Sequence, residues 1–122
     1  MPSQSDFPLI FARLKKILQK HAKRLTVIAD TPTNYYLDAG YSEKYKRPIF
    51  FGAVTVRKNY VSYYLMPVYM FPDLLKDISP ELKKRMQGKS CFNFKAADQA
   101  LFAELAQLTQ KGIDRVKREK LL

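Results

Sequence analysis

The segment from Pro48 to Met70 constrains the fold more than any other part of the chain. Both of its flanks are dense in β-branched and aromatic side chains, which suit a pleated, half-buried surface. The polar break at residues 57–59 ends in Asn59, a residue that tolerates the positive φ of a tight hairpin. Pro67 has no amide N–H to donate, so strand pairing should stop near it. The segment therefore predicts two antiparallel strands in the middle of a sheet.

Amphipathic helices are predicted at both ends of the chain, where apolar side chains recur at steps of three and four residues. The first helix should run from about Asp6 to Arg24, and Asp98 should open the long C-terminal helix. Turn-forming residues divide the segment between the first helix and the central hairpin. We expect strands at Leu25–Ala29 and Tyr35–Leu37, the second ended by Asp38-Ala39-Gly40, and then a loop at Tyr41–Arg47.

After the hairpin, residues 71–78 suggest one or two helical turns. Ser79 and Pro80 then suit the N-cap and first position of another helix, which we expect to stop at Gly88. Ser90–Lys95 alternates polar and apolar residues and should form the last strand. The order of elements predicts an α+β domain with helices on one face of an antiparallel sheet and the other face partly open. The predicted core contains Phe11, Leu14, Leu18, Val54, Val56, Val61, Leu65, Phe92, Leu101, Leu105 and Leu108.

A length of 122 residues favours one domain spanning 1–122, whose charged end at Arg115–Lys120 should fray. The single cysteine fits a reducing compartment, and no segment has the pattern of a signal peptide or a membrane span. These features predict a cytoplasmic protein without a membrane partner. The net charge of +11 favours anionic partners such as nucleic acid, although a basic surface also serves solubility alone.

All eight tyrosines lie between residues 35 and 69, and the same segment contains the cations Lys44, Lys46, Arg47, Arg57 and Lys58. Period-two alternation places Tyr60, Ser62 and Tyr64 on one face of the hairpin and Val61, Tyr63 and Leu65 on the other. Aromatic rings interleaved with cations can stack bases and hold phosphates. The alternative is that these tyrosines only roof the open side of the sheet, with buried rings and wet hydroxyls. The candidate anion-binding residues are Lys46, Arg47, Arg57, Lys58, Tyr60 and Tyr64.

No catalytic or metal site is predicted. Asp73, Asp77 and Glu81 are spaced four residues apart, but three acids without a histidine are an incomplete ligand set. His21 lies at the border of the first helix's apolar face, as an ordinary edge histidine does. Cys91 lacks a histidine partner, so we expect an inert thiol although Lys89 is near in sequence. We therefore expect a protein that is not an enzyme and has no cofactor of its own.

Two runs of sequence resemble the YdhG-like family of small bacterial domains of unknown function. They are residues 59–69, NYVSYYLMPVY, and residues 78–94, ISPELKKRMQGKSCFNF, and the resemblance extends over about 33–112. It implies a frataxin-like sandwich, in which helices pack on an antiparallel sheet. Some relatives are regarded as iron chaperones for iron–sulfur cluster assembly, so iron enters only through this resemblance. The first helix here carries a row of lysines where frataxin-like proteins carry an acidic ridge, and no iron ligand can be carried over.

The sequence thus favours a non-enzymatic binding module for an anionic ligand or nucleic acid. The alternative, from the resemblance, is a frataxin-like intracellular iron chaperone. Convergence of cations with tyrosines would favour the first function, and convergence of exposed carboxylates the second.

Overall fold

The computed structural model describes residues 6–120, which form a six-stranded antiparallel sheet, two long helices and several short helical turns. The elements in chain order are α1 (Phe7–Gln19), the 3₁₀ turn η2 (Ala22–Arg24), β1 (Thr26–Thr31), β2 (Asn34–Ser42), β3 (Arg47–Val56), β4 (Val61–Leu65), α2 (Met66–Met70), the 3₁₀ turn η3 (Pro72–Leu75), α3 (Pro80–Lys83), β5 (Met86–Gln87), β6 (Cys91–Phe94) and α4 (Gln99–Arg118).

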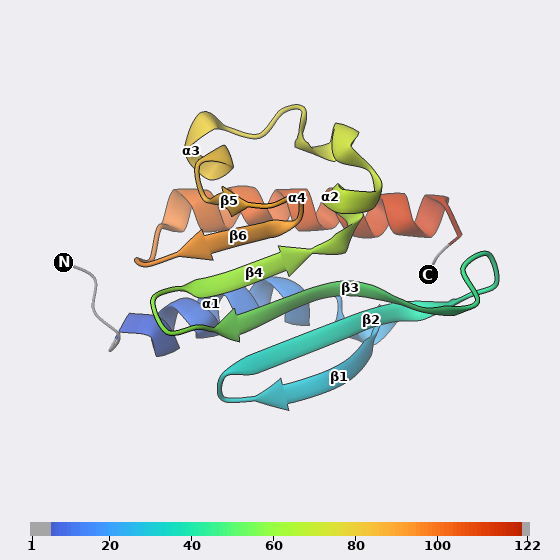
Figure 1. Ribbon diagram of the computed structural model, residues 1–122, viewed down its shortest axis with the longest axis horizontal. Helices are drawn as coiled ribbons and strands as arrows, with labels where there is room; N and C mark the ends of the chain where they lie inside the picture. Colours follow the sequence, from blue (N-terminus) through green and yellow to red (C-terminus); the bar gives the residue numbers. More distant parts are fainter. Residues whose placement is uncertain (1–5, 121–122) are drawn as a thin grey trace.

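The strands lie in the order β1-β2-β3-β4-β6-β5 (Figure 1). The first four strands form a meander, in which each strand pairs with the one before it. The chain then leaves the sheet through α2, η3 and α3, returns at the edge strand β5 and turns inward to place β6 beside β4. The central hairpin predicted from the sequence is β3–β4, and β4 ends just before Pro67 as expected.

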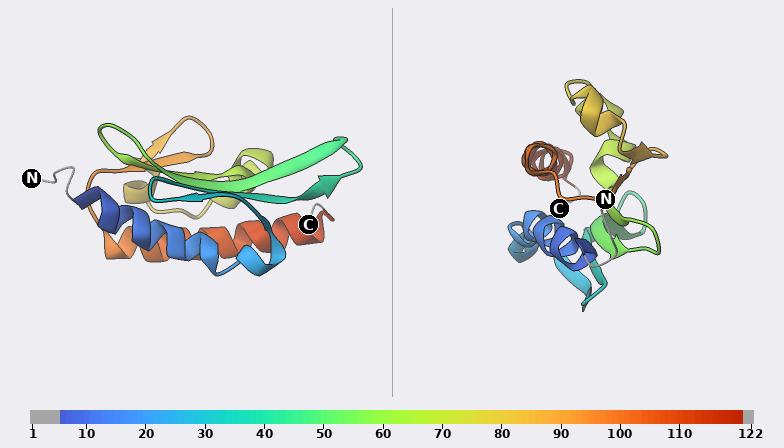
Figure 2. Two further views of the ribbon diagram at one scale, coloured as in Figure 1. Left: turned by 90° about the horizontal axis from the view of Figure 1, so that it is seen from below. Right: turned by 90° about the vertical axis from the view of Figure 1, so that its left-hand side faces the viewer.

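Both long helices cover the same face of the sheet, and the short helix α2 borders the opposite face (Figure 2). α1 and α4 lie side by side, and Arg13 Nη1 on α1 donates to Gln99 Oε1 on α4 at 2.6 Å. The predicted α+β class and the one-sided packing are therefore confirmed. Within residues 6–120, no helix combines the length and the apolar composition needed to cross a bilayer.

The core fills the space between the sheet and the two helices. Val61, Tyr63 and Leu65 face the helices and are fully buried, as the alternation predicted. The hydroxyls of Tyr63 and Thr109 share a hydrogen bond across the core, so the one polar group of this ring is satisfied. Every residue of the predicted core is buried except Val56, which is half-buried at the end of β3.

β2 is longer than the sequence predicted. It continues through Asp38 and Gly40 to Ser42, so the expected strand end and the loop at Tyr41–Arg47 were wrong. Pairing with β3 outweighs the turn preference of Asp38 and Gly40, so the strand continues through them. The register of the pairing shifts after Leu37, which accommodates these residues. The tight turn is closed by Ser42, whose carbonyl oxygen accepts from Lys46 N at 2.7 Å. β2 and β3 consequently form one long hairpin that extends beyond the rest of the sheet.

The helix predicted to reach Gly88 is also shorter than expected. Ser79 caps α3 as predicted, accepting from Leu82 N at 3.1 Å, but the helix ends at Lys83. The next residues pair with β6 to form the edge strand β5, and Gly88, at φ 79°, lies in the β5–β6 turn. Strand pairing therefore decides this segment, because Gly88 suits a hairpin turn as well as a helix end.

The N-terminal helix also stops earlier than predicted, at Gln19 rather than Arg24. A short 3₁₀ turn follows, and the first strand is shifted to Thr26–Thr31. His21 lies at this junction, where it is buried rather than at the edge of the apolar face.

Candidate functional site

The face of the sheet opposite α1 and α4, here called the open face, carries two adjacent rows of side chains. Strand register aligns Tyr36, Ala53, Tyr64 and Cys91 in one row across β2, β3, β4 and β6. The neighbouring row consists of Asn34, Thr55, Ser62 and Asn93. Half of the first row is therefore aromatic, and the second row is entirely polar.

Hydrogen bonds hold the polar row in place. Ser62 Oγ donates to Asn93 Oδ1 at 2.7 Å, and Asn93 Nδ2 donates to Gln87 Oε1 at 2.7 Å. At the other side, Thr55 Oγ1 donates to Asn34 Oδ1 at 3.0 Å. These bonds fix the orientation of the amides, so the row presents an ordered set of donors and acceptors.

Arg57 joins the first row at the β3–β4 end of the face. Its Nη2 donates to the Tyr64 hydroxyl at 2.8 Å, and its guanidinium carbon lies 6.0 Å from the centre of that ring. Such a pair places a permanent positive charge beside an aromatic ring. Lys58 and the half-buried Tyr60 belong to the same hairpin.

A hollow of about 870 Å³ lies on the open face between the β2–β3 hairpin and α2. We call it the Asp38 hollow, because Asp38 is the only acid among the residues that line it. A shallower hollow of about 540 Å³ adjoins it and reaches Arg57 and Tyr64. Tyr36 and Phe50 line both hollows, with ring centres 4.7 Å apart. The two hollows therefore adjoin, and together we call them the depression of the open face.

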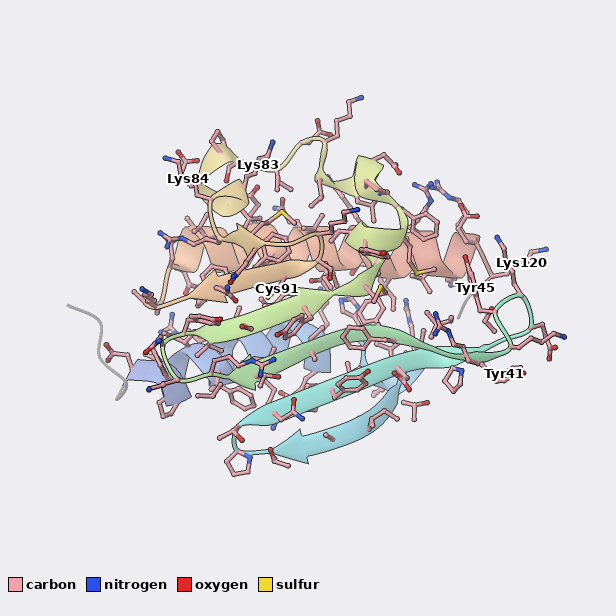
Figure 3. The ribbon with its side chains drawn as sticks, viewed as in Figure 1. Tyr41, Tyr45, Lys83, Lys84, Cys91 and Lys120 are labelled. Carbon is pink, nitrogen blue, oxygen red and sulfur yellow. The ribbon has the colours of Figure 1, made fainter. Side chains whose placement is uncertain are left out.

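Cations lie beside two of the tyrosines that line the Asp38 hollow. Lys44 Nζ lies 5.4 Å from the ring centre of Tyr45, and Lys89 Nζ lies 5.9 Å from that of Tyr69. Arg47 lines the hollow directly. Figure 3 shows Tyr45 on the β2–β3 hairpin, at the end of the sheet remote from Cys91. The hollow is thus aromatic inside and positive at its rim.

Asp38 is half-buried in this setting and, within residues 6–120, makes no hydrogen bond or ion pair through its carboxylate. Burial raises the pKa of its carboxyl group. Burial and the charge of Asp38 also raise the pKa of Tyr36. The carboxylate is therefore partly desolvated and still has its acceptor oxygens available.

The residues predicted to bind an anion fall into two groups rather than one. Lys46 and Arg47 lie at the β2–β3 end of the sheet, whereas Arg57, Lys58 and Tyr60 lie at the β3–β4 end. The two groups are separated by the length of β3, about 30 Å for a ten-residue strand. Tyr64 lies between them on the open face. The expected convergence into a single cluster is not found, and the residues mark the two ends of one face.

Sequence reasoning missed the residues between these ends: Tyr36, Asp38, Phe50 and Tyr69. The signal was present, since Tyr36 and Asp38 share a face by period-two alternation. The shared face was overlooked because the strand was expected to end at Leu37. Phe50 was not singled out, since the β3 pairing that places it beside Tyr36 is a tertiary feature.

The remaining sequence candidates do not form chemical sites in the described part of the chain. Burial raises the pKa of the Cys91 thiol, and its Sγ donates to Asn93 Oδ1 at 3.3 Å. Asp73 pairs with Arg115 at 2.9 Å, and this hydrogen bond lowers the pKa of its carboxyl group. Among residues 6–120, no group of three or more His, Cys, Asp and Glu side chains is placed to hold a metal ion.

The burial of His21 predicts a pH-dependent stability for the protein. Burial lowers its pKa from 6.5, and the charges of Lys20 and Arg24 add to this more than Asp114 opposes it. The unfolded chain therefore binds a proton before the folded one as pH falls through about 6.5. We expect the free energy of unfolding to decrease between pH 7.5 and 5.5, measured by denaturant titration. In the His21→Gln variant, the free energy of unfolding should decrease less over this pH range. An unchanged decrease would mean that other groups cause it.

Comparison with known proteins gave no match: no family model, curated protein or solved structure is significantly similar to this chain.

Proposed function

We propose that the protein is a non-enzymatic binding module whose open face holds single-stranded nucleic acid. The observation that carries this proposal is the depression of the open face, which joins half-buried and exposed rings to cations at both ends. Nonspecific single-strand binders combine the same two elements, a positive groove and aromatic stacking platforms.

Stacking would come from the middle of the face. Tyr36 and Phe50 form one platform, and Tyr64, held by Arg57, forms a second. Every base has a flat π-face, so such platforms accept any sequence at about 1–3 kcal/mol for each stacked base.

Phosphate contacts would come from the ends of the face. Arg47 and Arg57 lie at opposite ends of β3, so a strand running along the depression would meet a cation at each end. A span of about 30 Å fits a site on the order of 4–16 nucleotides. The net charge of +11 would add a long-range attraction to any such strand.

The test is a salt-dependent titration of the protein with a fluorescent ten-nucleotide single strand. Binding should weaken with salt, and Arg57→Gln should reduce the log–log slope by about 0.7, as expected for one lost phosphate contact. Lys111→Gln is the matched control, because Lys111 is an exposed cation on α4, in the helical layer. It removes the same charge and should leave the slope unchanged.

An equal change of slope in both variants would mean that net charge alone drives binding, and the open face would lose its role. Absence of binding at low salt would rule out the function altogether.

The resemblance to the YdhG-like family supports a further proposal, a frataxin-like sandwich. In its favour is the order of helix, antiparallel sheet and helix, with both long helices on one face. The iron-chaperone alternative would need converging carboxylates, and no observation among residues 6–120 favours it. A parallel titration with iron(II) distinguishes the two functions, since binding of iron without nucleic acid would restore the chaperone.

A further inference from the structure

We propose that the Asp38 hollow is a nucleotide pocket that selects guanine, with Asp38 reading the base. This inference rests on the proposed function only where the guanine belongs to a bound strand. A free nucleotide would offer the pocket the same base and phosphate, so its binding does not depend on that function. Its basis is the combination of an unpaired carboxylate, flanking aromatic rings and a cationic rim in one hollow.

The carboxylate decides which base is preferred. An ionised carboxylate has two acceptor oxygens and no donor. Guanine is the base whose Watson–Crick edge carries two adjacent donors, N1–H and the N2 amino group. Adenine and cytosine place a ring acceptor beside their amino group, and that acceptor would face a carboxylate oxygen. Asp38, which has no partner of its own within residues 6–120, therefore complements guanine.

The aromatic residues supply the faces against which a base can lie. Tyr36 and Phe50 lie beside Asp38, and Phe50 is its partner in the strand register. Tyr45 and Tyr69 line the same hollow and are 43% and 53% exposed, so their rings are available. A base whose edge meets Asp38 would thus stack on side chains already in place.

The rim decides between an anionic and a cationic ligand. An aromatic hollow with a carboxylate would also suit an organic cation such as a quaternary ammonium. Here Arg47 lines the hollow, and Lys44 and Lys89 lie over its tyrosines, so positive charge exceeds the single acid. A nucleotide fits both the cationic rim and the carboxylate, because its phosphate would contact the rim while the N–H groups of its base would donate to Asp38.

The experiment compares nucleotides first. We expect guanosine monophosphate to bind more tightly than adenosine monophosphate by roughly 5- to 150-fold, the value of one bidentate base contact. Thymidine decamers with one central guanine or adenine test the same ratio within a strand. The wild-type ratios need no variant, so they test the inference even if a substitution impairs folding.

Asp38→Asn then tests the residue. Asparagine presents an acceptor beside a donor, so the guanine-to-adenine ratio should fall to about one or reverse. Glu43→Gln is the matched control, since it removes one exposed negative charge from the β2–β3 turn without lining the hollow. That variant should keep the wild-type ratio, because a uniform gain in affinity for anions cancels in it.

The outcomes separate this inference from the proposed function. Strand binding without a guanine preference would overturn the inference and leave the function. A preference for guanosine monophosphate with no strand binding would uphold the pocket and overturn the function. A ratio that Asp38→Asn leaves unchanged would overturn the role of Asp38.

Discussion

Replacing Phe92 by alanine is expected to lower the free energy of unfolding by about 3–5 kcal/mol. Phe92 lies in β6 and is fully buried against the helical layer. Truncating its ring removes buried apolar area and leaves a cavity that a closely packed core closes only in part. Domains of this size are stabilised by only about 5–15 kcal/mol, so the variant should approach the limit of folding. Denaturant titration measures the loss.

The adjacent residue provides the control for this experiment. Cys91→Ala changes the preceding position of β6, which points to the open face and is half-buried. Its loss should be less than about 1 kcal/mol, because few buried atoms are removed. Equal losses at the two positions would contradict the assignment of one face to the core and the other to solvent.

Replacing Tyr36 by alanine is expected to weaken binding of the ten-nucleotide strand by roughly 5- to 150-fold, the contribution of one stacked base. Tyr36 lines both hollows of the open face and packs on Phe50, so its loss removes the central platform. Equilibrium titration at constant salt measures the effect, and circular dichroism confirms that the variant is folded.

Tyr41→Ala is the corresponding control. Tyr41 is 59% exposed on β2 and lines neither of the two hollows. Its removal deletes the same side chain and should change affinity less than about twofold. If both variants weakened binding equally, exposed aromatic surface in general would be responsible, and the depression of the open face would lose its special role.

The periodicity of the sequence sufficed for the class of fold and for much of the core. Val61, Tyr63 and Leu65 alternate with polar neighbours, and this alternation alone assigned them to the buried face. Ser79 was predicted as a helix N-cap and Asp98 as the start of the C-terminal helix, and each side chain accepts a backbone hydrogen bond at the N-terminus of its helix. These features depend on residues near in sequence, which is why sequence reasoning reached them.

The errors share one cause, the pairing of strands. Asp38 and Gly40 have weak strand preferences, yet β2 passes through them because β3 pairs alongside. The residues around Met86 continue a helical pattern but pair with β6 as an edge strand. In each case long-range hydrogen bonds outweigh a local preference worth a fraction of a kcal/mol per residue.

The candidate site shows the same division. The sequence by itself determined that all eight tyrosines fall in the segment between residues 35 and 69, together with five of the 22 cations, and that the central hairpin has two unlike faces. Only the tertiary structure decided that Arg47 and Arg57 lie at opposite ends of one face, and that Tyr36, Asp38 and Phe50 meet between them. The physical reason is register: alternation fixes which face a side chain takes, whereas its neighbours across the sheet follow from the pairing of distant strands.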